Sequence, residues 1–100
     1  MTVGILGGGA MGSGIAQVAA MAGHKVTLVD LSTSVLQKAL LSIQSQLEKG
    51  IEKGKITSQE KEQILERISV AVEISSLVGC DMVIEAILEK LEVKQKVLDE

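Results

Sequence analysis

The chain contains no Phe, Tyr, Trp or Pro, and only one Cys and one His among its 100 residues. The hydrophobic core must therefore consist of Ile, Leu, Val, Met and Ala, and no aromatic ring is available to stack on a nucleic-acid base. The formal net charge is −3, and no cluster of basic residues stands out. These features argue against nucleic acid and against an anionic membrane surface as partners.

The single cysteine, Cys80, has no partner for an internal disulfide, and we expect it to be a small buried hydrophobic residue. One cysteine fits a reducing compartment. The sequence shows neither a signal peptide nor an uninterrupted run of about 20 apolar residues that could span a membrane. These features predict a cytoplasmic protein. Cys80 and the only histidine, His24, lack the spacing of metal ligands, so no metal site is predicted.

Apolar runs and helical periodicity alternate along the chain, which predicts one α/β domain. The expected strands are 2–6, 25–30, 68–72 and 82–86. The expected helices are 10–22, 33–53 and 58–67, with a short helical turn near 74–78 and a last helix from Glu89 or Lys90 to the end. This alternation predicts a Rossmann-type doubly wound parallel sheet of about four strands in the order 3-2-1-4. The helices 33–53 and 58–67 would form a hairpin inserted after the second strand.

A glycine motif, G-x-G-x-x-G, lies between the first expected strand and the first helix, with Gly7, Gly9 and Gly12 as its glycines. Gly7 would permit a tight turn, Gly9 would let a pyrophosphate approach the backbone, and Gly12 would let the helix pack close to the strand. The backbone at the start of this helix, at Ala10 and Met11, would bind the pyrophosphate. A glycine-rich turn without a ligand is the alternative.

Asp30 ends the second expected strand, about twenty residues after the glycines, where dinucleotide-binding folds place an acidic residue. Its carboxylate would accept hydrogen bonds from the ribose hydroxyls of adenosine and would repel a 2′-phosphate. No arginine follows it, because the next residues are Leu31, Ser32 and Thr33. The sequence therefore predicts NAD rather than NADP as the cofactor. The alternative is that Asp30 only caps the next helix.

Three segments carry a family resemblance: GGGAMGSGIAQV at 7–18, AGHKVTLVD at 22–30 and DMVIEAILE at 81–89. With the hairpin after the second strand, they resemble the 3-hydroxyacyl-CoA dehydrogenases, in particular the 3-hydroxybutyryl-CoA dehydrogenases. The resemblance covers essentially the whole chain. It implies an NAD-dependent oxidoreductase that interconverts 3-hydroxyacyl-CoA and 3-oxoacyl-CoA by hydride transfer, with an acyl-CoA as substrate.

The resemblance also implies roles for three further residues. Glu89 matches the glutamate that orients the catalytic histidine of the family, and Glu89 and Lys94 match positions on the nicotinamide side of the cofactor. Lys53 matches a lysine that contacts a CoA phosphate. A second CoA contact of some relatives falls on Gln46, which lacks the hydroxyl found there. Without the resemblance, Glu89 is equally a first-turn helix residue, and Lys53 an ordinary cation at a helix C-terminus.

The family's catalytic histidine and its all-helical domain, which closes over the substrate and forms the dimer, match no residue of this chain. We therefore expect residues 1–100 to be the N-terminal portion of a dinucleotide-binding domain from a homodimeric enzyme, and to lack hydride-transfer activity alone. Two alternatives remain. One is another NAD-dependent β-hydroxyacid dehydrogenase, such as a 3-hydroxyisobutyrate or 6-phosphogluconate dehydrogenase relative, which usually lacks the long hairpin. The other is a non-catalytic NAD-binding module.

Overall fold

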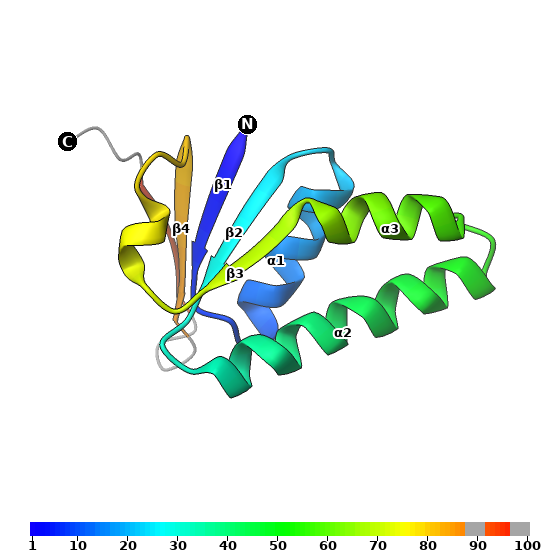
Figure 1. The fold of residues 1–100 in the computed structure, drawn as a ribbon, viewed down its shortest axis with the longest axis horizontal. Coiled ribbons are helices and arrows are strands. Elements are labelled where there is room, and N and C mark those ends of the chain that lie inside the picture. Colours follow the sequence, from blue (N-terminus) through cyan, green and yellow to red (C-terminus); the bar gives the residue numbers. More distant parts are fainter. Residues whose placement is uncertain (88–91, 97–100) are drawn as a thin grey trace.

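The computed structural model describes residues 1–87 and 92–96. A single twisted sheet runs through the molecule, with helices against it (Figure 1). The strands are β1 (Thr2–Leu6), β2 (Lys25–Val29), β3 (Ile68–Ala71), β4 (Met82–Ile87) and β5 (Glu92–Lys96). The helices are α1 (Ala10–Met21), α2 (Thr33–Glu52) and α3 (Ser58–Glu66), and a short 3₁₀ turn, η1, spans Ile74–Leu77. These bounds lie within one or two residues of the sequence-based prediction from residue 2 to residue 87.

The sheet has the order β3-β2-β1-β4-β5, and its first four strands are parallel. Val3 of β1 lies in register with Val26 of β2 and with Met82 of β4. The predicted order 3-2-1-4 is therefore confirmed. Because parallel strands point the same way, the glycine segment after β1 and Asp30 after β2 meet at the carboxyl edge of the sheet.

The expectation of a last helix from Glu89 or Lys90 is wrong within the described residues. Residues Glu92–Lys96 form β5, which pairs antiparallel with β4 and brings Lys94 into register with Glu85. Intrinsic helix propensity is a weak prior that tertiary context overrides. Here the antiparallel pairing supplies hydrogen-bond partners to the backbone along the outer edge of β4, which a helix over the same residues would leave unpaired.

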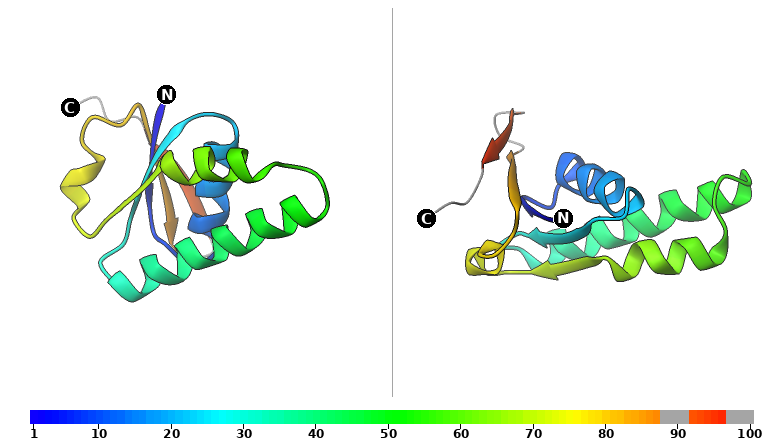
Figure 2. Two further views of the ribbon diagram at one scale, coloured as in Figure 1. Left: turned by 45° about the vertical axis from the view of Figure 1, so that its right-hand side comes forward. Right: turned by 90° about the horizontal axis from the view of Figure 1, so that it is seen from above.

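The two faces of the sheet are covered unequally. Helices α1, α2 and α3 all lie on one face, and η1 is the one helical segment of the described residues that lies on the other (Figure 2). The small side chains of Ala16 and Ala20 are fully buried, so α1 lies close to the strands. The core on the helical face consists of aliphatic side chains and alanines, as the lack of aromatics predicts: Val3, Ile5, Ala16, Ala20, Val26, Leu28, Leu36, Ala39, Ile43, Leu47, Ile64 and Ala86.

On the opposite face, η1 and the residues after it cover a smaller cluster of Val29, Leu77, Cys80 and Val83. Cys80 is buried there, so its predicted structural role is confirmed. Burial raises the pKa of the Cys80 thiol above its ordinary value, a hydrogen bond with Thr27 opposes this, and the nearby charge of Asp81 adds to it. A buried thiol with a raised pKa is a poor nucleophile.

The α2–α3 hairpin projects past the sheet (Figure 1). Ser32 caps α2 by accepting the N–H of Val35, at 3.3 Å, and Gly54 follows the helix with a φ of 72°. The predicted capping box at α3 is confirmed, because Thr57 and Glu60 exchange backbone-to-side-chain hydrogen bonds of 3.0 and 3.1 Å. No helix in the described part of the chain is both long enough and apolar enough to cross a membrane.

Candidate cofactor site

The glycine segment turns sharply between β1 and α1. Gly7 has a φ of 113°, a conformation that L-amino-acid side chains rarely adopt, and a Cβ added there would collide with the carbonyl oxygen of Ala86. The Gly7 N–H donates to the carbonyl of Val29 over 2.7 Å. The turn is therefore held between the ends of β2 and β4, and its first glycine cannot be replaced without moving the backbone.

Gly12 sets how closely α1 approaches this turn. A Cβ added at Gly12 would run into the carbonyl oxygen of Gly7, and the residue is buried. A Cβ added at Gly14, two residues later, would meet no heavy atom within 4 Å. The predicted role of Gly12 in close packing therefore has a definite structural basis.

The N-terminus of α1 carries no cap. Gly9 occupies the N-cap position with extended backbone (φ −71°, ψ −165°), and no side chain accepts a hydrogen bond from the helix start. The first turn contains no acidic residue. The first N–H groups of a helix have no acceptor within the helix, and its dipole favours an anion. The site at Gly9, Ala10 and Met11 therefore fits a pyrophosphate, which would bind to the backbone without needing a buried counter-cation.

Asp30 holds two turns together at the end of β2. Its Oδ2 accepts the N–H of Gly8 and its Oδ1 accepts the N–H of Ser32, both over 2.9 Å. The N-cap of α2 is Ser32 itself, so Asp30 does not cap that helix. Each carboxylate oxygen has a second lone pair. Asp30 can therefore accept ribose hydroxyls while both of these backbone hydrogen bonds remain.

A cavity of about 740 Å³ opens at this edge of the sheet. The predicted residues Gly7, Gly9, Ala10 and Asp30 line it, together with Leu6, Gly8, Ser13, Leu31, Val35, Lys38, Ala39, Ser42 and Ala86. Met11 and Gly12 lie in the same turn of α1 without lining the cavity. The volume is in the range of small-molecule sites. Four of the predicted cofactor residues therefore line one open cavity.

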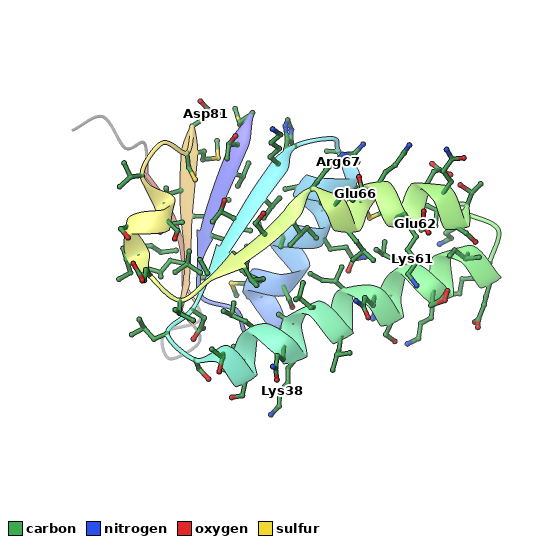
Figure 3. All side chains as sticks on the ribbon, in the orientation of Figure 1. Lys38, Lys61, Glu62, Glu66, Arg67 and Asp81 are labelled. Carbon is green, nitrogen blue, oxygen red and sulfur yellow. The ribbon has the colours of Figure 1, made fainter. Side chains whose placement is uncertain are left out.

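The contribution of α2 to the cavity is not part of the sequence prediction. Val35, Lys38, Ala39 and Ser42 line it from this helix. Their spacing of three and four residues, next to the buried Leu36 and Ile43, is the signal that would have found them. Lys38 brings a cation to a site where no arginine follows Asp30 in the sequence. This lysine is exposed, and it lies at the carboxyl end of the sheet, whereas Arg67 and Asp81 lie toward the opposite end (Figure 3).

The other predicted site residues lie elsewhere. Lys53 is exposed at the C-cap of α2, about 16 Å along the helix from Ser42, the last residue of α2 that lines the cavity. Glu89 lies outside the described residues, and Lys94 belongs to β5. The roles of these three residues stay predictions. Within the described residues, no three His, Cys, Asp or Glu side chains group as metal ligands would.

Comparison with known proteins agrees with this geometry. The family model described as "3-hydroxyacyl-CoA dehydrogenase, NAD binding domain" matches residues 2–100. The chain belongs to this family. As a 3-hydroxyacyl-CoA dehydrogenase NAD-binding domain, it is 43% identical over 94 residues to the 3-hydroxyadipyl-CoA dehydrogenase of Escherichia coli K12. It is 42% identical over 98 residues to a 3-hydroxybutyryl-CoA dehydrogenase of Bradyrhizobium diazoefficiens.

Solved structures share the fold of this NAD-binding domain. The crystal structure of (S)-3-hydroxybutyryl-CoA dehydrogenase from Ralstonia eutropha matches 88% of the chain, with a TM-score of 0.85 and 42% identity. The chain covers 31% of that protein, 20% of the Escherichia coli relative and 33% of the Bradyrhizobium relative. The domain therefore corresponds to between a fifth and a third of each of these relatives.

Proposed function

We propose that this chain is the NAD-binding part of an enzyme that interconverts 3-hydroxyacyl-CoA and 3-oxoacyl-CoA. The uncapped start of α1 beside Gly7 and Gly12 carries the proposal, because it fits a pyrophosphate held by backbone N–H groups alone. The relatives named for 3-hydroxyacyl-CoA substrates, at 42 and 43% identity, support the acyl-CoA substrate. We assign the enzyme to the cytoplasm and expect it to be a homodimer.

In this proposal the start of α1 and the Asp30 carboxylate have separate tasks. The backbone of Gly9, Ala10 and Met11 binds the pyrophosphate, and Asp30 accepts the hydroxyls of the adenosine ribose. NAD, when bound, supplies the hydride acceptor. The Asp30 carboxylate disfavours a 2′-phosphate, so NAD is preferred over NADP. Lys38 lines the same cavity, but its ammonium is exposed and long side chains of this kind are readily displaced, so the carboxylate dominates.

Three residues outside the cavity complete the proposed enzyme. Glu89 orients a histidine that matches no residue of this chain and stabilises its charged form while that histidine takes the substrate hydroxyl proton. Lys94 contacts the nicotinamide side of the cofactor. Lys53 contacts a CoA phosphate, and its place at the far end of α2 suits an extended substrate whose two ends are held far apart.

An NADH-oxidation assay with acetoacetyl-CoA tests the proposed activity. We expect this chain alone to bind NADH without oxidising it, and the complete gene product to oxidise NADH only when acetoacetyl-CoA is present. In that complete protein, Glu89→Gln should lower turnover at least ~100-fold with little change in NADH affinity, because a positioned acid–base group contributes roughly 10²–10⁴-fold. NADH oxidation with the aldehyde that corresponds to a 3-hydroxyisobutyrate-type substrate and not with acetoacetyl-CoA, or wild-type turnover in Glu89→Gln, would refute these assignments.

A further inference from the structure

The hydrogen bonds of Asp30 imply a role beyond the ribose. The carboxylate connects the glycine segment at Gly8, which lies 22 residues before Asp30 in the sequence, with the β2–α2 turn at Ser32. Gly8 is buried, and a Cβ added there would come within 3.2 Å of Val35 and 3.5 Å of the Asp30 Cβ. Gly8 is therefore packed against α2, and its N–H donates to the side chain of Asp30.

We propose that Asp30 is a positioning residue for the pyrophosphate-binding turn, in addition to its contact with the ribose. The proposal rests on NAD binding at this site. A hydrogen bond from a backbone N–H to a carboxylate is stronger than one between neutral groups. Two such bonds fix the orientation of the carboxylate and hold Gly8 in place. Gly8 directly precedes Gly9, the N-cap of α1, so Asp30 keeps the helix start shaped for an anion before the cofactor arrives.

The affinity for a modified cofactor distinguishes the ribose contact of Asp30 from its positioning role. The probe is an NADH analogue whose adenosine ribose lacks both hydroxyls, so Asp30 makes no ribose contact with it. If Asp30 acts only on the ribose, the wild-type chain and Asp30→Ala bind this analogue equally well. If Asp30 also positions the turn, Asp30→Ala binds the analogue about tenfold more weakly than wild type, the loss that one hydrogen bond to a charged group represents. Asp30→Asn, which keeps one acceptor oxygen, should fall between the two.

Asp81 offers a matched control. Its Oδ2 also accepts a backbone N–H, that of Thr2 at 2.7 Å, but at the opposite edge of the sheet. Asp81→Ala therefore removes a similar carboxylate–amide hydrogen bond far from the cavity. We expect it to leave the affinity for NADH and for the analogue unchanged. An equal loss of analogue affinity in Asp81→Ala and Asp30→Ala would overturn the proposal, because it would show a general effect on stability.

Amide hydrogen exchange tests the same inference without any cofactor. In the ligand-free wild-type chain the Gly8 N–H should be protected, and Asp30→Ala should speed its exchange by about tenfold. Failure of the wild-type chain to bind NADH would count against the proposed function alone, since exchange at Gly8 still reports on the turn. An unprotected Gly8 amide in wild type, or equal binding of the analogue by wild type and Asp30→Ala, would overturn the positioning role even where NADH binds.

Discussion

The two edges of the sheet each carry a cavity, but they are built differently. The carboxyl edge has about 740 Å³ lined by glycines, apolar side chains, one carboxylate, one lysine and two serines. The amino edge has about 580 Å³ lined by Thr2, Lys25, Val26, Thr27, Gln63, Glu66, Arg67 and Ser69. The first is formed largely by the glycine backbone and apolar side chains, and the second is lined mostly by charged and polar side chains.

The polar groups of the amino edge already serve the fold. Arg67 donates to the carbonyl of Ala20 over 2.8 Å, at the end of α1, and Asp81 accepts the N–H of Thr2. Figure 3 shows Arg67 and Asp81 together at this end of the sheet. At the carboxyl edge, the start of α1 has no cap. The comparison teaches that charged side chains at one edge can serve the fold, while at the other edge no side chain in the described part of the chain caps the helix start.

The largest effect on the fold is expected from adding one methyl group at Gly12. Gly12→Ala would place its Cβ against the Gly7 carbonyl, so either α1 or the glycine turn must move. We expect NADH affinity to fall roughly 5- to 150-fold and the unfolding temperature to drop, as overpacking costs of about 1–3 kcal/mol imply. Calorimetric titration and thermal unfolding measure the two effects.

Gly14→Ala is the matched control for that change, on the same helix. Its Cβ would meet no heavy atom within 4 Å, and alanine favours a helix over glycine by about 1 kcal/mol. This variant should bind NADH normally and unfold at a slightly higher temperature. Equal behaviour of the two variants would show that Gly12 has no special packing role.

Gly9→Val should separate binding from folding. The backbone of Gly9, with a φ of −71°, is open to other residues, so the fold should survive. The branched side chain would occupy the place proposed for the pyrophosphate, and NADH binding should become undetectable. Circular dichroism checks the fold, and titration with NADH checks the site. Unchanged affinity for NADH in a folded Gly9→Val chain would show that the pyrophosphate does not bind at this position.

A substitution at the amino edge should lower the stability of the chain without changing its affinity for NADH. Arg67→Met keeps much of the side-chain volume and removes the hydrogen bond to Ala20. We expect it to lower the free energy of unfolding by about 1–2 kcal/mol, because the Ala20 carbonyl loses its charged donor. NADH affinity should stay the same. A chain of normal stability with weakened NADH binding would mean that the amino edge takes part in the site.

The smallest expected effect is a pH dependence of the free energy of unfolding that is caused by Cys80. Burial raises the pKa of its thiol in the folded chain, so the unfolded chain releases this proton at a lower pH than the folded one. The folded state therefore keeps its full stability below the ordinary pKa of the thiol, about 8.5, and loses some of it as the pH rises through the folded pKa. Denaturant unfolding between pH 7 and 10 should show this loss in wild type but not in Cys80→Ala.

Local sequence signals predicted most of the fold because most of the helices, strands and turns are determined by residues within one short segment. The G-x-G-x-x-G turn and the Thr57–Glu60 capping box are formed by residues close together in the sequence, and Asp30 follows a strand, as predicted. The antiparallel β5 escaped prediction because its pairing with β4 depends on tertiary context. The α2 side of the cavity was not predicted, because Val35, Lys38 and Ser42 line a cavity only when α2 lies beside the glycine turn, and the sequence alone does not place the helix there.

Calorimetric titration of this chain with NADH, and then with NADPH, tests the central claim most directly. The account predicts saturable binding of NADH and much weaker binding of NADPH, because a backbone site takes the pyrophosphate and Asp30 disfavours a 2′-phosphate. Binding of NADPH more tightly than NADH would contradict the role of Asp30. A folded chain that binds neither would contradict the claim that the carboxyl edge is by itself a dinucleotide site.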